Sequence, residues 1–459
     1  MTDSTISAFD TEAFSPPRTL RFPGIVGLSL GLALCLHLAA VVYFAFGASL
    51  PAAISVLCGQ FLIGIALLRL FDGAFVFQDI RLVFLIFLFL YGGVLPLGVG
   101  AFGGTAIGLA GATFMYALAI LGFNVVQWWY AQPWVDVPIS VFKRYRPSFA
   151  NATMVFLGFV WIFYYALSRG IDFSFNVDHA QTLLLGTQLW IVSSLGMNGM
   201  VMYMIIGWPQ LTKQARVLVV LSVIAFIGFH LSMGNRRDYL AMMIFLAGVV
   251  ATKRHAVVKL RTVLIGFLLL VAFTIFGVIR QAIEAPVLLL GDPVQILVTQ
   301  NEFVSPIQTL IHYVNHPRPL RLGSTYITAP LLFLPRALWP DKPESLSLQF
   351  MLDAFGTTGI MGYAYTPVTE AYLNFAWIGP FLVFSIMSLL MVKLVKNANI
   401  RPGLYFISFA LIVDFNRSDA GSTLYSFGII GAAFFAMSVL SRIRWAPRVV
   451  RGAFPSGQP

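Results

Sequence analysis

Long apolar runs separated by short polar breaks dominate the chain. A helix that crosses a bilayer needs about 20 mostly apolar residues, and about twelve runs approach or exceed this length, with 239–252 and 402–415 the shortest. Residues 1–22 are polar and precede an apolar run too long for a cleaved signal peptide. The predicted spans are 24–48, 50–71, 82–100, 102–123, 149–168, 183–206, 216–232, 239–252, 262–280, 371–394, 402–415 and 421–440.

The composition supports a membrane protein over every water-soluble class. Hydrophobic residues make up 59% of the 459 residues, charged residues make up 10%, and the mean hydropathy is +0.85. Soluble domains carry roughly 25% charged residues, so a soluble enzyme, a disordered chain and a nucleic-acid binder are excluded despite the net charge of +11. Cys35 and Cys58 lie in apolar runs and indicate neither a disulfide framework nor a metal cluster. We therefore predict an all-α polytopic membrane protein.

The distribution of Lys and Arg predicts the orientation of the chain. With the N-terminus in the cytoplasm, twelve spans place most basic residues on the cytoplasmic side, as the positive-inside rule requires. Both termini are then cytoplasmic, in tails at 1–23 and 441–459, which flank helices in 24–280 and 371–440. Nine of the 29 basic residues fall on the outer side: Arg169, Arg236, Arg237, Arg280, Arg318, Arg321, Arg336, Lys342 and Arg417.

One connection, residues 281–370, is far longer than the others and lies on the outer side, between the ninth and tenth predicted helices. Loops of this length in a compact protein are usually functional. Apolar residues within it recur at a helical spacing, which predicts a helix at the membrane surface or packed on top of the bundle. They are Ile296, Leu297, Phe303, Ile307, Leu310 and Ile311.

Two basic clusters on the outer side suggest an anion site. Arg236 and Arg237, in the turn 234–238 (GNRRD), either anchor the helix ends at lipid headgroups or bind phosphate, which guanidinium groups contact in a bidentate manner. In 334–343 (LPRALWPDKP), three prolines stiffen the segment that carries Arg336, Trp339 and Lys342. This rigidity serves either to cap the bundle or to recognise a phosphate beside a sugar ring.

Two further outer segments carry carboxylates. In 365–375 (YTPVTEAYLNF), Thr366 or Thr369 is expected to cap a helix, with Pro367 in its first turn. Glu370 and Asn374 then share one face of that helix. In 414–419 (DFNRSD), Arg417 lies between two aspartates and is either ion-paired or a third outer arginine for a multidentate pyrophosphate pocket. Glu302, His312 and Arg280 are weaker candidates. A lone histidine such as His312 in a surface helix is usually a solvated residue without a functional role.

Together, the GNRRD turn, the PRALWPDKP and TPVTEAYLNFAWIG segments and the late arginine resemble the Wzy-type oligosaccharide repeat-unit polymerases of bacteria. The resemblance covers roughly residues 230–420 and implies a GT-C-like membrane glycosyltransferase. Such enzymes transfer a growing glycan from undecaprenyl pyrophosphate to a lipid-linked repeat unit, at the periplasmic face of the inner membrane, with inversion and without a metal or another cofactor. A chain-length regulator and a flippase are the implied partners.

The resemblance also implies roles for the candidate residues. Glu370 is the preferred base for the acceptor hydroxyl, with Glu302 as the alternative. The pyrophosphate ligands would be Arg236, Arg237, Arg336 and Arg417, with Arg280 and Lys342 as secondary candidates; the sugar-binding candidates are Trp339, Tyr372, Asn374 and His312.

Three other functions remain open. The first is a non-enzymatic membrane scaffold or assembly subunit, which the rigid proline-arginine segment disfavours. An O-antigen ligase would need His312 as its essential loop histidine, and the surroundings of His312 do not resemble the ligase motif. A transporter or flippase of lipid-linked oligosaccharides would favour an internal repeat, charged residues at mid-membrane and no loop of this length. The sequence has the opposite of all three features.

Overall fold

The long apolar runs form helices of membrane-spanning length. Within the part of the chain that the structure describes, nine helices are long and apolar enough to cross a bilayer, and helices satisfy their backbone polar groups internally, as a bilayer requires. The protein is therefore a polytopic membrane protein. The computed structural model describes residues 23–72, 75–102, 107–130, 133, 137–171, 188–232, 237–254, 268, 275, 301, 303–334, 338–356 and 364–442.

All the regular elements of these residues are helices. The elements before the long connection are α1 (Pro23–Ala45), α2 (Ser49–Asp72), α3 (Ile80–Phe102), α4 (Leu109–Tyr130), α5 (Ile139–Phe142), α6 (Phe149–Ser168), α8 (Gln188–Ile206), η1 (Trp208–Gln210), α9 (Lys213–Ser232) and α10 (Arg237–Lys253). Those that follow are α13 (Val304–Asn315), α14 (Ser324–Thr328), η3 (Ala329–Phe333), α15 (Leu346–Phe355), α16 (Pro367–Phe375), η4 (Ala376–Ile378), α17 (Gly379–Lys396), α18 (Pro402–Ala410), α19 (Ile412–Asn416) and α20 (Ala420–Arg442).

The predicted spans agree with these helices to different degrees. The prediction 149–168 coincides with α6. The span predicted at 102–123 begins and ends too early, because α4 starts at Leu109 and extends to Tyr130. The turn before α4 includes Gly108, whose φ of 82° favours glycine, and hydropathy does not mark a turn whose residues are themselves apolar. The predicted span 262–280 lies outside the described residues apart from 268 and 275, so the count of twelve stays a prediction.

Two predicted spans are broken in the structure. The range 371–394 contains α16, the 3-10 turn η4 and α17, and the chain bends so sharply that Gly379 packs against the carbonyl of Ala371. Ala376 has a φ of 53° in this bend. The range 402–415 consists of the two short helices α18 and α19, which meet at Leu411.

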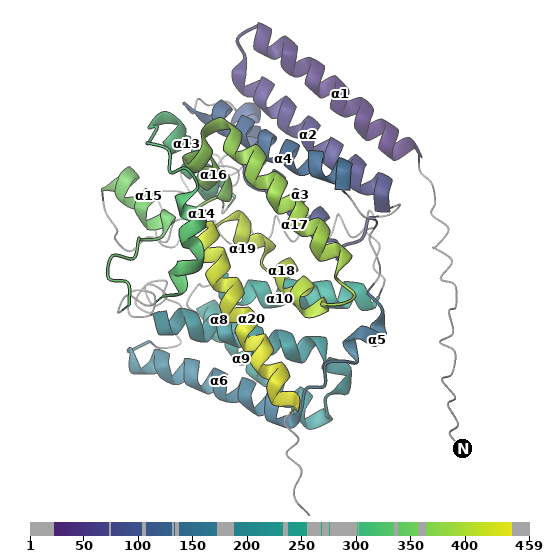
Figure 1. The fold of residues 1–459 in the computed structure, drawn as a ribbon, viewed down its shortest axis with the longest axis vertical. Helices are drawn as coiled ribbons and strands as arrows, with labels where there is room; N and C mark the ends of the chain where they lie inside the picture. The colour runs from purple at the N-terminus through teal and green to yellow at the C-terminus, as the bar shows by residue number, and fades with distance from the viewer. Residues whose placement is uncertain are drawn as a thin grey trace, which may run out of the picture.

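The helices form two groups that lie side by side (Figure 1). In the first group α1 packs on α2, α2 packs on α4, and α4 packs on α17, with α3 against α2 and α4. In the second group α8 packs on α6, α10 and α20, while α9 packs on α6 and α10 packs on α18. Small residues allow the closest approaches, as at Gly122 against the carbonyl of Phe381 and Gly199 against the carbonyl of Ile430.

The long connection enters the bundle instead of lying over it. At one end of α13, the Phe303 ring packs 5.1 Å from the ring of Tyr91, which lies in the middle of α3. At the other end, Asn315 donates to the carbonyl of Ile107, just before α4. The helix expected in this connection is therefore present from Val304, and it packs against α3, α4 and α16; Ile296 and Leu297 lie outside the described residues.

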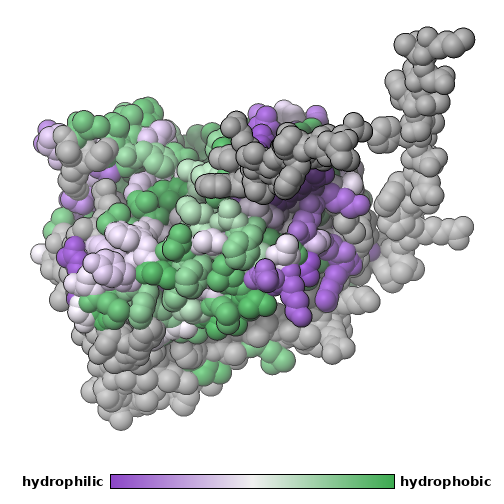
Figure 2. Space-filling model, turned by 90° about the horizontal axis from the view of Figure 1, so that it is seen from below, coloured by the Kyte–Doolittle hydropathy of each residue, from purple (hydrophilic) through white to green (hydrophobic). Residues whose placement is uncertain are grey.

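The surface of the molecule suits a lipid environment. Figure 2 shows hydrophobic residues gathered in a band across the face seen from below, with hydrophilic residues concentrated toward the right of the view. Many large apolar side chains of the spanning helices are exposed, such as Phe44, Leu157 and Phe435. Such a band is the expected surface of a protein immersed in a bilayer.

Candidate active site

The first turn of α16 places Glu370 inside the protein. The side chain of Thr366 caps the helix by accepting from the Val368 backbone N–H, and Pro367 occupies the first turn, so the predicted cap is confirmed at Thr366. The Tyr116 hydroxyl of α4 donates to Thr366 at 2.9 Å and ties this cap to the first helix group. Glu370 follows with only 1% of its surface exposed.

Both oxygens of the Glu370 carboxylate accept hydrogen bonds. Oε1 accepts from the hydroxyl of Thr325 at 2.6 Å, and Oε2 accepts from the backbone N–H of Ala420 at 2.7 Å. The amide of Asn374 donates to the Thr325 oxygen at 2.8 Å, so the Thr325 proton is directed at Glu370. Two donors thus hold the carboxylate in one orientation as an acceptor.

This carboxylate lies on the seam between the two helix groups. Glu370 belongs to α16, which packs on α17 and α4, whereas Ala420 is the first residue of α20 in the second group. Thr325 comes from α14, a short helix of the long connection. Three segments far apart in sequence therefore assemble around one acidic side chain.

A second carboxylate lies beside the first. Asp419, with 4% of its surface exposed, accepts from the backbone N–H groups of Ser422 at 2.7 Å and Leu346 at 3.3 Å. It is close enough to Glu370 for the two charges to interact, and the charge of Arg321 also acts on Glu370. Among the described residues neither carboxylate forms an ion pair, and Arg321 instead donates to Gln349 at 2.7 Å.

Two tyrosines flank the carboxylates. Burial raises the pKa of Tyr365 well above its ordinary value, and the nearby charges of Glu370 and Asp419 add to this effect. Burial, together with the charge of Glu370, likewise raises the pKa of Tyr326. Both phenols are therefore neutral, protonated donors at physiological pH. We call Arg321, Thr325, Tyr326, Tyr365, Glu370, Asn374 and Asp419 the Glu370 cluster.

The structure brings some of the sequence-predicted site residues to this cluster. Asn374 is fully buried and lies one turn after Glu370, as predicted. The backbone carbonyl of Arg417, which precedes Asp419 by two residues, accepts from the backbone N–H of Tyr365 at 3.2 Å. Tyr372 is half-buried, with its ring 6.2 Å from that of Trp377.

Other candidates lie elsewhere or outside the described residues. The Lys342 ammonium donates to the carbonyls of Leu332 and Leu334, so it fastens the two ends of the segment that contains Arg336. Trp339 is half-buried in that segment. Arg237 begins α10. Arg236, Arg280, Glu302 and Arg336 lie outside the described residues.

His312 lies on α13, against other rings. Its imidazole is 5.1 Å from the ring of Tyr313 and 5.4 Å from that of Phe350. Partial burial lowers the pKa of His312, and the neighbouring His316 lowers it further. The side chain is therefore neutral at physiological pH.

The sequence did not single out Thr325, Asp419, Tyr365 or Arg321 as site residues. Asp419 was considered as an ion-pair partner of Arg417, whereas its described hydrogen bonds are to backbone N–H groups at the start of α20 and α15. Tyr365 begins the segment 365–375, from which the sequence predicts the cap, Glu370, Tyr372 and Asn374 but not the tyrosine at its start. Arg321 was one of nine outer basic residues, and nothing local distinguished it. Among the described residues no group of three or more His, Cys, Asp or Glu side chains is placed to hold a metal ion.

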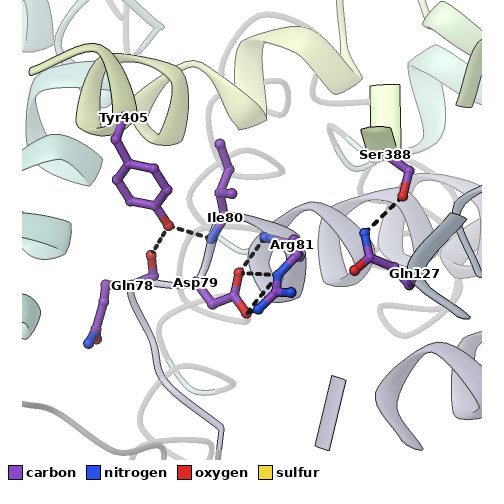
Figure 3. Close-up of polar contacts among 7 residues, drawn as sticks. All are labelled: Gln78, Asp79, Ile80, Arg81, Gln127, Ser388 and Tyr405. Atoms are coloured by element: carbon purple, nitrogen blue, oxygen red, sulfur yellow. Dashed lines mark hydrogen bonds and ion pairs between the residues drawn. The ribbon is translucent and has the colours of Figure 1, made fainter. Parts of the chain in front are cut away.

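A second buried polar cluster lies at the far end of α3 from the long connection (Figure 3). Asp79 and Arg81 form an ion pair at 2.8 Å, with side-chain exposures of 2% and 0%. The Tyr405 hydroxyl of α18 donates to the carbonyl of Gln78 at 2.6 Å and accepts from the backbone N–H of Ile80 at 3.0 Å. We call these residues the Asp79 cluster, which also joins the two helix groups.

Comparison of the chain with protein-family models, curated proteins and solved structures finds no match. The support for the candidate site is therefore its geometry.

Proposed function

We propose that this protein is a membrane glycosyltransferase that polymerises oligosaccharide repeat units. It transfers a growing glycan from undecaprenyl pyrophosphate to a sugar hydroxyl of an incoming lipid-linked repeat unit. The reaction inverts the anomeric centre and takes place on the periplasmic side of the bacterial inner membrane, with both termini cytoplasmic.

The observation that carries this proposal is the oriented, buried carboxylate of Glu370 on the seam. A base for glycosyl transfer must accept a proton from a hydroxyl at a fixed position. Glu370 has both oxygens directed by donors, and no described basic side chain neutralises it by an ion pair. A solely structural carboxylate in the protein interior is normally paired with a cation, as Asp79 is with Arg81.

The proposed step follows from this geometry. The acceptor oxygen bonds to the anomeric carbon of the donor while its proton passes to Glu370. The bond from that carbon to the pyrophosphate oxygen breaks, and the leaving group departs with the electron pair. Arg236, Arg237, Arg336, Arg417 and, secondarily, Arg280 are the proposed pyrophosphate ligands.

The contacts of Lys342 within the chain favour a structural role for its ammonium group. Its ammonium is already engaged by two carbonyls of the chain. We therefore assign Lys342 to holding the segment that presents Arg336, rather than to direct binding of pyrophosphate.

A ligase of the O-antigen type is the second candidate function, and one observation favours it. The Nε2 atom of His312 is buried and has no hydrogen-bond partner among the described residues, and a neutral imidazole is able to act as a base. Deletion of the gene separates the two functions.

Deletion of the gene gives distinct results for each function. Loss of a polymerase should reduce the ladder of surface glycan to a single repeat unit, as seen by gel electrophoresis. Loss of a ligase should leave long glycan unattached on its lipid carrier, and loss of a flippase should remove surface glycan altogether. An unchanged ladder in the deletion strain would contradict the proposal.

A further inference from the structure

Two phenol hydroxyls near Glu370 have no hydrogen-bond partner among the described residues. The hydroxyl oxygens of Tyr365 and Tyr326 are buried and form no hydrogen bond with any described residue. Leaving a buried hydroxyl unsatisfied costs free energy, so buried polar groups in folded proteins are usually paired. Two unsatisfied phenols next to one carboxylate therefore indicate a ligand that would pair with them.

The positions of the two phenols are fixed by their neighbours. Tyr365 directly precedes the α16 cap, is 1% exposed, and donates its backbone N–H to the Arg417 carbonyl. Tyr326 directly follows Thr325, the residue bonded to Glu370, and its ring stacks on that of Phe375 with centroids 6.4 Å apart. The two tyrosines thus belong to different segments, and the charge of Glu370 acts on both phenols.

The hydrogen-bonding capacity of this group matches a hydroxyl ligand. A hydroxyl has one proton to donate and two lone pairs that accept. The two protonated phenols supply two donors, and each Glu370 oxygen keeps a lone pair beyond its bond to Thr325 or Ala420. A hydroxyl bound here would donate to Glu370 and accept from one tyrosine, which leaves its second lone pair free. The other phenol would donate to a neighbouring oxygen of the same sugar. An anion would be repelled by Glu370 and Asp419, and an ammonium group would leave the phenol protons unpaired.

We propose that Tyr365 and Tyr326 bind the acceptor sugar, one at its reacting hydroxyl and the other at a neighbouring oxygen, and hold the reacting hydroxyl against Glu370. This inference rests on the proposed function, and it assigns the acceptor subsite to the seam between α14, α16 and α20. One tyrosine donates to the oxygen that attacks the donor through its free lone pair, and the other donates to the neighbouring oxygen. Glu370 removes the proton of the attacking oxygen, and the pyrophosphate leaves with the electron pair of the broken bond.

The variants Y365F and Y326F test the inference, because each removes only the unsatisfied hydroxyl. The full-length variants are expressed in the deletion strain, and ladder length is compared at equal protein abundance. Thermal unfolding of each purified protein is measured in detergent. Each variant should unfold at or above the wild-type temperature and polymerise roughly tenfold more slowly, the effect of losing about one hydrogen bond to the acceptor sugar. The double variant should produce single repeat units.

Y405F is the matched control, because Tyr405 is also a buried phenol but is fully paired, at the far cluster. Y405F should unfold at a lower temperature and keep a ladder of normal length. A ladder of normal length from the Y365F/Y326F double variant would overturn the inference and leave buried water as the partner of these phenols. If E370Q kept the ladder, the base assignment and this inference would both fail. If deletion of the gene kept it, the proposed function itself would fail.

Discussion

The Asp79 cluster and the Glu370 cluster are both buried and both join the two helix groups. They differ in whether a cation is paired with the buried carboxylate. The guanidinium of Arg81 neutralises Asp79 and donates to both of its oxygens. Glu370 has only neutral donors at its oxygens, and the charge of Asp419, which acts on it, has the same sign. The carboxylate of the first cluster is paired with a cation. The carboxylates of the second have no ion pair among the described residues, and two phenols beside them have hydrogen bonds left to donate.

The unpaired groups of the two clusters support the same distinction. The Gln78 amide also has no partner among the described residues. It points away from the Asp79–Arg81 pair (Figure 3), so no charged group of this cluster is left for a ligand. The unpaired phenols of Tyr365 and Tyr326, in contrast, lie next to a carboxylate that can accept a proton. We infer that the Asp79 cluster fastens the seam and that the Glu370 cluster performs the chemistry.

The largest expected effect is that of E370Q. The amide keeps the size of the side chain but is a far weaker base than the carboxylate. Polymerisation should fall by about 10²–10⁴-fold, the usual contribution of general-base catalysis, as measured by repeat units joined per protein molecule. A long ladder from E370Q would transfer the role of base to Glu302.

The next effect concerns stability at the opposite cluster. D79N leaves the Arg81 charge buried without its partner, which should reduce the free energy of unfolding by about 3–5 kcal/mol. Chemical denaturation in detergent measures this loss. The double variant with Asp79→Leu and Arg81→Met should recover most of it, because apolar residues replace a buried ion pair at little cost. Surviving D79N protein should polymerise normally, and a loss of activity in folded D79N would contradict the division of roles.

A smaller effect is expected at Thr325. T325V keeps the shape of the side chain but removes the proton that orients Glu370, so polymerisation should fall roughly tenfold, about one charge-assisted hydrogen bond. T325S keeps the hydroxyl and should retain most activity. Equal rates for T325V and T325S would show that Thr325 only packs against α16.

Local sequence signals predicted the parts of the site that one helix supplies. The Thr366 cap and the common face of Glu370 and Asn374 follow from turn chemistry and helical periodicity, and both are present. Hydropathy located α6 to the residue, but it misplaced the start of α4 because apolar residues surround the turn at Gly108.

The remaining parts of the site depend on contacts distant in sequence. Thr325 and Ala420 meet Glu370 from 45 and 50 residues away, and no local pattern encodes such a contact. The entry of the long connection into the bundle was also not predicted. Its apolar stripe suits a membrane surface and a buried seam equally well, and only packing of Phe303 on Tyr91 distinguishes them.

The most direct test of Glu370 as the base of a polymerase uses the purified protein in lipid vesicles, supplied with an undecaprenyl-pyrophosphate-linked oligosaccharide. Glycan length and released undecaprenyl pyrophosphate are measured together, with E370Q as the matched control. We expect one released carrier for each repeat unit joined by the wild type and almost none from E370Q. Carrier release or chain extension at equal rates in both proteins would contradict this expectation.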